Sequence, residues 1–306
     1  MSKPVIDTIA HRLRPAGSQK IETGKDLANI SFNDDAFTEL FVTEGGACFP
    51  ILVKWRRHAK RILVFGQSAI SNRDGLTLPI YHRWTWSDDF PNATCIWLSD
   101  PTLHLSETLL GGWFQGEPEH FYAETAAQII ANIASLCDIP TELIYFYGSS
   151  AGGFSSIVMA DELNANAIAE IPQINMTKYH VKSVTDELLK HSLKCPTMDI
   201  AKEKFEYRMN IIARLTQRKS IPNITILQNV NDNIHMKNHI YPLLESLSAM
   251  HDTHTSLAHR RFRMELFANR GPTGDGHVVA TKQFTLDAIR QTMRDLEVSL
   301  GRQVQI

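Results

Sequence analysis

The feature that most constrains this chain is a short apolar run that ends in a glycine-rich turn. Residues 143–147 (LIYFY) predict a buried strand, and helix-compatible residues follow through position 160. Between them, Gly148-Ser149-Ser150-Ala151-Gly152 fits the pattern G-x-S-x-G. A sharp turn from strand to helix holds the central serine in a strained conformation and exposes its hydroxyl at the carboxyl edge of the sheet. The spacing selects Ser150, not Ser149, as the candidate nucleophile.

Two glycines flank this serine at positions where a side chain would collide with the neighbouring strand or helix. Gly148 and Gly152 lie two residues before and two residues after Ser150, so we expect the turn to require both of them. Ser150 would also stand at a helix N-terminus, where the helix dipole favours developing negative charge. The alternative interpretation is a glycine-rich turn in which the serine has no chemical role.

Strand-like and helix-like segments alternate along most of the chain. This alternation predicts an α/β fold with a mainly parallel sheet and helices on both faces. We expect residues 1–30 to form an irregular N-terminal arm and residues 31–306 to form one domain. A mostly helical insertion at about residues 176–219 would be either a lid or a plain structural extension. After a hairpin at 39–53, the expected strands are 61–65, 94–98, 143–147, 167–170, 224–230 and 263–267, and the longer helices are 121–137, 235–250 and 278–300.

Composition places the chain among ordinary globular proteins and argues against several functions. Of the 306 residues, 43% are hydrophobic and 21% are charged, and the net charge of −2 gives no footprint for nucleic acid. The four cysteines form no CxxC pair, so we expect no metal site. Because no apolar run is long enough to span a bilayer and the N-terminus lacks an apolar signal core, we expect no membrane span and a cytoplasmic location.

A serine nucleophile needs a base, and the base needs an acid that orients it. With a nucleophile on this kind of turn, the acid follows the serine along the chain and the histidine comes last. Asp232 fits the acid, because it follows an expected strand and would project from the same sheet edge as Ser150. Its alternative role is to cap the helix near His235. Asp252 follows a helix and Glu265 lies inside a strand, so both are less well placed.

The best candidate for the base is His277. It follows the last expected strand and precedes the closing helix, and the glycines of residues 271–277 (GPTGDGH) would let this loop fold over the nucleophile. His235 is the alternative base, although solvent exposure or helix capping explains it more simply. Asp275, in the same loop as His277, could take the place of Asp232 as the acid.

Two backbone N–H groups are expected to stabilise the oxyanion that forms on a substrate carbonyl. One belongs to Ala151, the residue after the nucleophile. The other belongs to Gln67 or Ser68, in the loop after an expected strand, and the sequence does not separate these two. His277 would then take the proton of Ser150, and an acyl-enzyme would form and be released by water or by another hydroxyl.

Six tracts carry a resemblance to known proteins: residues 65–69 (FGQSA), 79–84 (PIYHRW), 99–103 (SDPTL), 112–116 (GWFQG), 148–154 (GSSAGGF) and 171–173 (IPQ). They resemble the α/β-hydrolase superfamily and, more narrowly, the capsular-polysaccharide O-acetyltransferases and related proteins of bacterial surface-glycan clusters. The resemblance implies an α/β-hydrolase fold with Ser150, Asp232 and His277 as a catalytic triad. It also implies acetyl transfer to a sugar hydroxyl from acetyl-CoA, which would be a donor substrate and not a bound cofactor.

The sequence leaves three classes of function open. The first is an O-acyltransferase with a small-molecule acyl donor and a glycan-like acceptor, best represented by a polysaccharide O-acetyltransferase. The second is a carboxylesterase or glycan deacetylase with the same triad, and the third is a non-catalytic binding protein of the same fold. Trp84, Trp86, Trp113 and Phe114 lie near expected loops, where they would either stack on sugar faces or pack in the core. The oligomeric state is left open.

Overall fold

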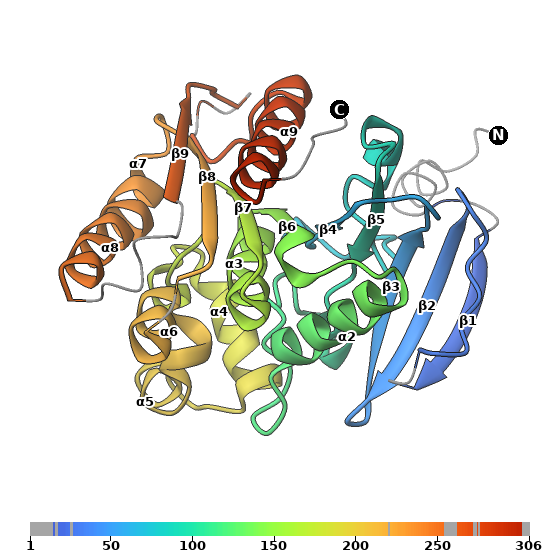
Figure 1. Cartoon of the computed structure of the whole chain (residues 1–306). Helices are drawn as coiled ribbons and strands as arrows, with labels where there is room; N and C mark the ends of the chain where they lie inside the picture. The colour runs from blue at the N-terminus through green and yellow to red at the C-terminus, as the bar shows by residue number, and fades with distance from the viewer. Residues whose placement is uncertain are drawn as a thin grey trace, which may run out of the picture.

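The computed structural model describes residue 15 and residues 18–24, 27–219, 221–253, 262–271, 274 and 276–301. These residues form a nine-stranded sheet that runs through the centre of the molecule (Figure 1). The strand order across the sheet is β1-β2-β3-β5-β4-β6-β7-β8-β9. The strands are β1 (Gln19–Gly24), β2 (Phe37–Glu44), β3 (Ala47–Lys54), β4 (Arg61–Phe65), β5 (Ala93–Leu98), β6 (Ile144–Ser149), β7 (Asn166–Glu170), β8 (Asn223–Asn229) and β9 (Phe262–Phe267).

Most neighbouring strands are parallel, as the sequence predicts. Strands β4 to β9 pair in parallel with one another, and β3 pairs antiparallel with both β2 and β5. Every residue of β4, β5, β6 and β7 is buried, which is typical of strands covered on both faces. The carboxyl ends of these parallel strands meet at one edge of the sheet, and the loops that leave this edge carry the predicted site residues.

Helices cover both faces of the sheet (Figure 1). Alternate residues of β6 show the division: Ile144 and Phe146 belong to one apolar cluster, whereas Tyr145 and Tyr147 belong to the other. The first cluster packs under α2 (Tyr122–Leu136) and α3 (Ala151–Leu163), and the second packs under α9 (Lys282–Ser299). The period of two along a strand thus anchors helices on opposite faces. The predicted α/β architecture is confirmed.

The predicted insertion is largely helical. It contains η4 (Met176–Lys178), α4 (Lys182–Leu188), the π-helix η5 (Leu189–Leu193), α5 (Met198–Met209) and α6 (Ile211–Arg218). Two buried arginines fix its second half to the core. Arg214 on α6 pairs with Asp161 on α3 at 2.6 Å, and Arg208 on α5 donates to the carbonyl oxygens of Glu117 and Pro118. Helices α5 and α6 are therefore tied to the rest of the domain by buried polar contacts.

The predicted irregular arm contains a strand in its described part. Strand β1 pairs in parallel with β2 along the edge of the sheet. Four of its six residues are exposed, Ile21 and Thr23 are half-buried, and Ile21 packs against the core. Such a short and mostly polar edge strand gives a weak apolar pattern, which is why the sequence predicts irregular chain here. Most of residues 1–18 lie outside the described residues.

The remaining helical segments lie in the connections between strands. They are η1 (Trp84–Asp89), η2 (Pro101–Leu105), η3 (Thr141–Leu143), α7 (Asn233–His235), η6 (Met236–Ile240) and α8 (Tyr241–Thr253).

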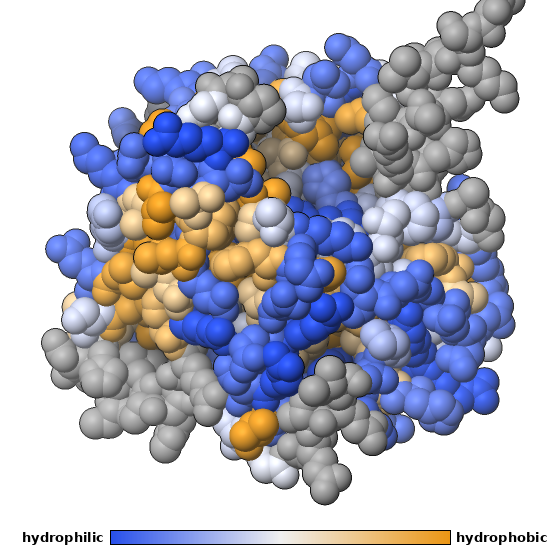
Figure 2. Space-filling view, turned by 90° about the horizontal axis from the view of Figure 1, so that it is seen from above, coloured by the Kyte–Doolittle hydropathy of each residue, from blue (hydrophilic) through white to orange (hydrophobic). Residues whose placement is uncertain are grey.

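Large exposed apolar side chains gather on β9, on α7 and α8 and in the loop after β8, and Figure 2 shows an apolar area on the side where Figure 1 places β9 and α8. No helix among the described residues combines the length and apolar content needed to cross a bilayer.

We expect Arg214→Met to lower the free energy of unfolding by about 3–5 kcal/mol, because it leaves the Asp161 carboxylate buried without its main partner. The double variant Arg214→Met/Asp161→Leu should cost less than the sum of the two single changes, since no charge is then left buried alone. Urea unfolding measures both effects. A loss below about 1 kcal/mol in the single variant would show that this pair does not anchor the insertion.

Candidate active site

Ser150 occupies the sharp turn between β6 and α3. Its backbone has φ 54° and ψ −117°, a conformation that a non-glycine residue rarely adopts. The Ser150 N–H donates to the carbonyl oxygen of Glu170 on the neighbouring strand at 2.9 Å, which helps to hold this conformation. Such strained residues persist only where the surrounding structure determines them, and they cluster at functional sites.

Both flanking glycines lie in close backbone contacts, and the contact at Gly148 excludes a side chain. A Cβ atom on Gly148 would lie 2.3 Å from the carbonyl oxygen of Gly152. A Cβ atom on Gly152 would lie 3.0 Å from the carbonyl oxygen of Gly66, in the loop after β4. The turn therefore packs against the loop that was expected to supply an oxyanion donor.

Three side chains from distant parts of the chain meet at the carboxyl edge of the sheet. The Ser150 Oγ lies 3.0 Å from the His277 Nε2, and the His277 Nδ1 lies 2.7 Å from the Asp232 Oδ2. Asp232 comes from the loop after β8 and His277 from the loop after β9. This continuous path of hydrogen bonds is the geometry needed for a histidine that takes a serine proton while a carboxylate orients its ring.

The loops that carry the acid and the histidine are tied together by Asn229, the last residue of β8. Its Nδ2 donates to the carbonyl oxygens of Asn269 and Gly276, each at 2.8 Å. Gly276 itself must lack a side chain, because a Cβ atom there would lie 2.0 Å from the carbonyl oxygen of Asn231. Asn229 was not predicted from the sequence, since its role depends on a loop that is far away along the chain.

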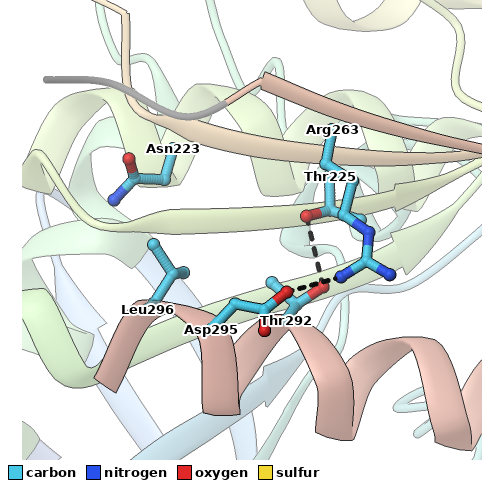
Figure 3. A pocket seen from close by; sticks show the side chains of 6 residues that line it. All are labelled: Asn223, Thr225, Arg263, Thr292, Asp295 and Leu296. Carbon is cyan, nitrogen blue, oxygen red and sulfur yellow. Dashed lines mark hydrogen bonds and ion pairs between the residues drawn. The ribbon is translucent and has the colours of Figure 1, made fainter. Parts of the chain in front are cut away.

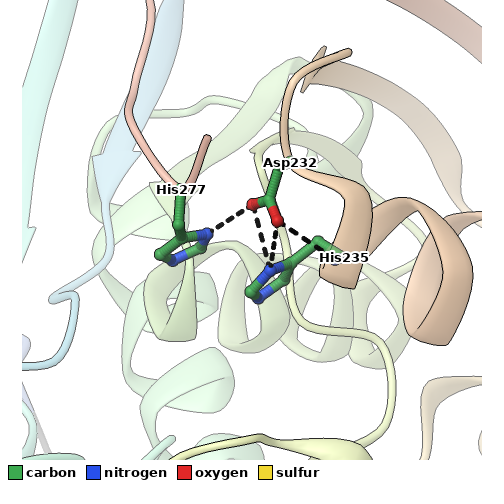
Figure 4. A group of neighbouring side chains, drawn as sticks. All are labelled: Asp232, His235 and His277. Atoms are coloured by element: carbon green, nitrogen blue, oxygen red, sulfur yellow. Dashed lines mark hydrogen bonds and ion pairs between the residues drawn. The ribbon is translucent and has the colours of Figure 1, made fainter. Parts of the chain in front are cut away.

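A second imidazole contacts the same carboxylate (Figure 4). The His235 Nδ1 lies 3.0 Å from the Asp232 Oδ1, and the backbone N–H of His235 donates to that same oxygen. The His235 ring stacks on the His277 ring, with centroids 4.0 Å apart and planes at 14°. Asp232 thus caps α7, as the alternative interpretation proposed, and faces His277 at the same time. His235 lies behind the acid, and the imidazole nitrogen that contacts Ser150 is that of His277.

The environment keeps Asp232 ionised. Burial raises the pKa of its carboxyl, but hydrogen bonds from His235 and His277 outweigh burial and hold the pKa well below its usual range. Burial lowers the pKa of His235, which therefore favours its neutral form. A charged carboxylate beside the His277 ring would stabilise the imidazolium that forms when the ring accepts a proton.

Asp232, His235 and His277 also form a group whose ligand atoms lie within 4.8 Å of one another, a spacing at which a metal ion could bind. Each imidazole Nδ1 of the group already faces an oxygen of Asp232 at hydrogen-bond distance. The His277 Nε2, the second ring nitrogen, faces Ser150. Hydrogen bonds alone therefore account for the arrangement of these three side chains.

The other two candidate acids do not enter this arrangement. Glu265 lies within β9 and pairs with Arg263 at 2.8 Å. Asp275 and the side chain of Asp252 lie outside the described residues.

The two candidates for the second oxyanion donor differ in their hydrogen bonds. The Ser68 N–H donates to the His82 Nδ1 at 3.2 Å, and the Ser68 hydroxyl donates to the carbonyl oxygen of Ser149. Within the described part of the chain, the Gln67 N–H has no hydrogen-bond acceptor. The Gln67 Oε1 accepts from the Ser99 hydroxyl and the Asp100 N–H, which fixes this loop. The geometry favours Gln67 as the partner of the Ala151 N–H, which belongs to the first turn of α3 and needs no acceptor within the helix.

A buried carboxylate beside the turn was missed in the sequence. Glu170, the last residue of β7, is fully buried and accepts hydrogen bonds from the Tyr147 hydroxyl at 2.6 Å and the Ala280 N–H at 2.7 Å. The guanidinium of Arg83 lies 3.8 Å away and donates to the Ser149 hydroxyl. Glu170 therefore holds the chain after His277 against the sheet. The sequence predicts only a strand here, because nothing in it shows that the partners of Glu170 converge at this point.

The four aromatic residues considered for sugar stacking are mostly engaged in the core. Trp113 and Phe114 are each 1% exposed, so the stacking interpretation is wrong for these two. Trp86 is half-buried and stacks on Tyr147, and Trp84 packs edge-on against Phe37. Packing in the core therefore explains Trp113 and Phe114, whereas Trp84 and Trp86 are only partly covered by their neighbours.

A small pocket lies at the opposite edge of the sheet (Figure 3). Its lining includes the start of β8, the start of β9 and the last turns of α9. The polar side chains there pair with one another, Thr292 with Thr225 at 3.2 Å and Arg263 with Asp295 at 2.8 Å. The pocket therefore does not belong to the Ser150 site.

No protein-family model matches the chain, and no curated protein sequence does either. Solved structures do match it. The capsule O-acetyltransferase of Neisseria meningitidis serogroup A superposes with a TM-score of 0.60 at 17% identity, over 82% of this chain and 96% of that one. An S-formylglutathione hydrolase from Agrobacterium tumefaciens superposes with a TM-score of 0.56 at 11% identity, over 87% and 98%. The chain has the α/β-hydrolase fold.

A third similar structure is the Glycosylation Associate Protein (Gap123) complex from Streptococcus agalactiae, with a TM-score of 0.59 at 13% identity. The match covers 85% of this chain and 46% of that one, so this chain spans about half the length of that relative. At these identities the similarity is one of fold, and the roles of residues must be argued from the geometry of the site.

We expect His239 to make the fold sensitive to acid. Its ring lies next to that of His235, with centroids 4.8 Å apart. Burial, reinforced by the nearby His235, lowers the pKa of His239 to about 3, whereas in the unfolded chain it is about 6.5. Below pH 6.5 the unfolded state binds a proton that the folded state does not. Above pH 6.5 the titration of His239 therefore does not lower the free energy of unfolding. As the pH falls from 6.5 toward 3, the free energy of unfolding decreases by about 1.4 kcal/mol per pH unit.

Urea unfolding between pH 7 and pH 5 measures this effect. His239→Asn retains an acceptor for the Ile174 and Asn175 N–H groups that bond to His239, and it should reduce the dependence on pH. An unchanged slope in the variant would show that His239 is not the group that titrates.

Proposed function

We propose that this chain is an enzyme that forms an acyl-enzyme on Ser150 and transfers an acetyl or other acyl group to a hydroxyl, as a polysaccharide O-acetyltransferase does. The observation that carries the proposal is the hydrogen-bonded series Ser150, His277 and Asp232, with distances of 3.0 Å and 2.7 Å. The strained turn that presents Ser150 supports it, because such strain is retained where a site needs it.

In the first step the His277 Nε2 takes the hydroxyl proton of Ser150 while the Oγ bonds to the carbonyl carbon of the donor. The N–H groups of Ala151 and Gln67 stabilise the oxyanion, and Asp232 stabilises the imidazolium. As the tetrahedral intermediate breaks down, the bond to the leaving group breaks and His277 returns the proton to it. With acetyl-CoA as the donor, that leaving group is a thiol.

In the second step an acceptor hydroxyl gives its proton to His277 and attacks the acyl carbon. The bond between the acyl carbon and the Ser150 Oγ breaks, and the Oγ recovers its proton from His277. With a sugar hydroxyl as the acceptor the reaction is acyl transfer, and with water it is ester hydrolysis. The similar fold of a capsule O-acetyltransferase supports a sugar acceptor. The geometry of the three side chains serves either acceptor.

We expect Ser150→Ala to lower turnover of an activated ester by roughly 10⁴-fold or more while the protein stays folded. Ser149→Ala is the matched control, because it removes the adjacent hydroxyl, which bonds to Ser68 and Arg83 but lies outside the series. Initial rates with p-nitrophenyl acetate compare the three proteins. If Ser150→Ala retains more than a tenth of the wild-type rate, Ser150 is not the nucleophile.

Transfer and hydrolysis are separated by the fate of the acetyl group. We expect wild-type protein to consume acetyl-CoA faster when a polyol or oligosaccharide acceptor is present, and the acceptor to gain acetyl esters detectable by mass spectrometry. Thiol release that is equally fast without acceptor would make the protein a hydrolase. No acyl transfer at all from acetyl-CoA or activated esters would favour a binding protein. We expect a chelator to leave the rate unchanged, because none of the proposed steps uses a metal.

A further inference from the structure

A buried amide contacts the Ser150 hydroxyl. The Gln173 Nε2 lies 3.1 Å from the Ser150 Oγ, and Gln173 is fully buried in the loop after β7. The backbone N–H of Gln173 also faces the carbonyl oxygen of Ser150 at 3.4 Å. The Oγ therefore has two polar neighbours, the His277 imidazole and the Gln173 amide.

The orientation of this amide is fixed by its second partner. The Trp113 indole N–H, which is also buried, donates to the Gln173 Oε1. An indole nitrogen donates hydrogen bonds and accepts none, so the atom that faces it must be the amide oxygen. The NH₂ group must then face Ser150. Gln173 donates to the Oγ, and the hydroxyl proton of Ser150 is left to face His277.

Both partners are carried on backbone that is rarely seen for their residue types. Trp113 and Phe114 have φ values of 48° and 54°, and Ile171, two residues before Gln173, has φ 41°. A positive φ is a clear outlier for a β-branched residue such as isoleucine. The Asp100 carboxylate accepts from the Phe114 N–H at 2.9 Å and holds that turn. Two strained turns thus bring the indole and the amide into line with Ser150.

We propose that Gln173 is a further catalytic residue, which donates a hydrogen bond to the Ser150 Oγ, and that Trp113 is the residue that positions it. The proposal rests on the acyl-enzyme function above. The Oγ is neutral before the reaction and gains negative charge as its proton leaves. It gains charge again when the acyl group departs and the bonding electrons return to it. A donor to the Oγ therefore stabilises both transition states more than the resting enzyme.

The test compares two substitutions that preserve the shape of Gln173. Gln173→Met keeps about the same side-chain volume but has no amide. It therefore separates the loss of the hydrogen bond to the Oγ from the loss of packing. Gln173→Glu still accepts from Trp113 and can donate to the Oγ only while its carboxyl is protonated. Stopped-flow release of nitrophenolate from p-nitrophenyl acetate gives the rate of acylation, and decay of the acetylated protein by intact mass gives the rate of deacylation.

We expect Gln173→Met to slow both steps by about 10- to 100-fold, the loss of one hydrogen bond to a developing charge, with little change in KM. The rate of Gln173→Glu relative to wild type should fall as the pH rises through the pKa of the introduced carboxyl, whereas the relative rate of Gln173→Met should not depend on pH. Trp113→Phe should slow the wild type by about threefold or more, but it should have almost no effect when combined with Gln173→Met.

Two results would overturn the proposal. Folded Gln173→Met within threefold of wild type in both rates would show that Gln173 only fills space, while Ser150 remains the nucleophile. Wild-type protein that shows no acetyl group on Ser150 would overturn the acyl-enzyme function and this role with it. If Gln173→Met does not fold, the pH dependence of Gln173→Glu decides, and a flat relative rate counts against the proposal.

Discussion

The architecture of the site depends on one backbone constraint, the positive φ of Ser150 between β6 and α3. The constraint requires glycine at position 148 and favours it at position 152, because the strand, the first turn of α3 and the loop after β4 come into close contact there. It also places the hydroxyl at the carboxyl edge of the sheet, where loops from parallel neighbours converge. Relaxing this turn would displace the Ser150 hydroxyl and the Ala151 N–H. It would also disturb the close packing against the loop that carries the Gln67 N–H.

Around this turn, the parallel sheet brings together residues that are far apart along the chain. The loops after β7, β8 and β9 deliver Gln173, Asp232 and His277 to the same edge. Buried polar residues then fix those loops to one another: Asn229 joins the acid loop to the histidine loop, and Glu170 holds the chain after the histidine. Each of these groups is satisfied by named partners, which is the condition under which a buried polar network makes a site rigid.

The parts of this arrangement that could be predicted are those with a local signal. The alternation of strands and helices predicts the parallel sheet, and the spacing of residues 148–152 predicts the turn. Ser150, Asp232 and His277 were selected because each follows a strand, and the structure brings them within hydrogen-bond distance; their catalytic roles remain a proposal. The contributions of Glu170 and Gln173 could not be predicted, because each depends on partners that are distant in sequence. Core packing of Trp113 was one of the two interpretations that the sequence left open, and β1 was missed because its apolar pattern is weak.

The central claim is that Ser150 carries the acyl group, and the most direct measurement is the position of that group. Wild-type protein mixed with acetyl-CoA or an activated acetyl ester, quenched in acid, digested and analysed by mass spectrometry should carry one acetyl group on the peptide that contains residues 148–154, with fragmentation that assigns it to Ser150. An acetyl group found on another side chain, or no adduct while substrate is consumed, would contradict the account.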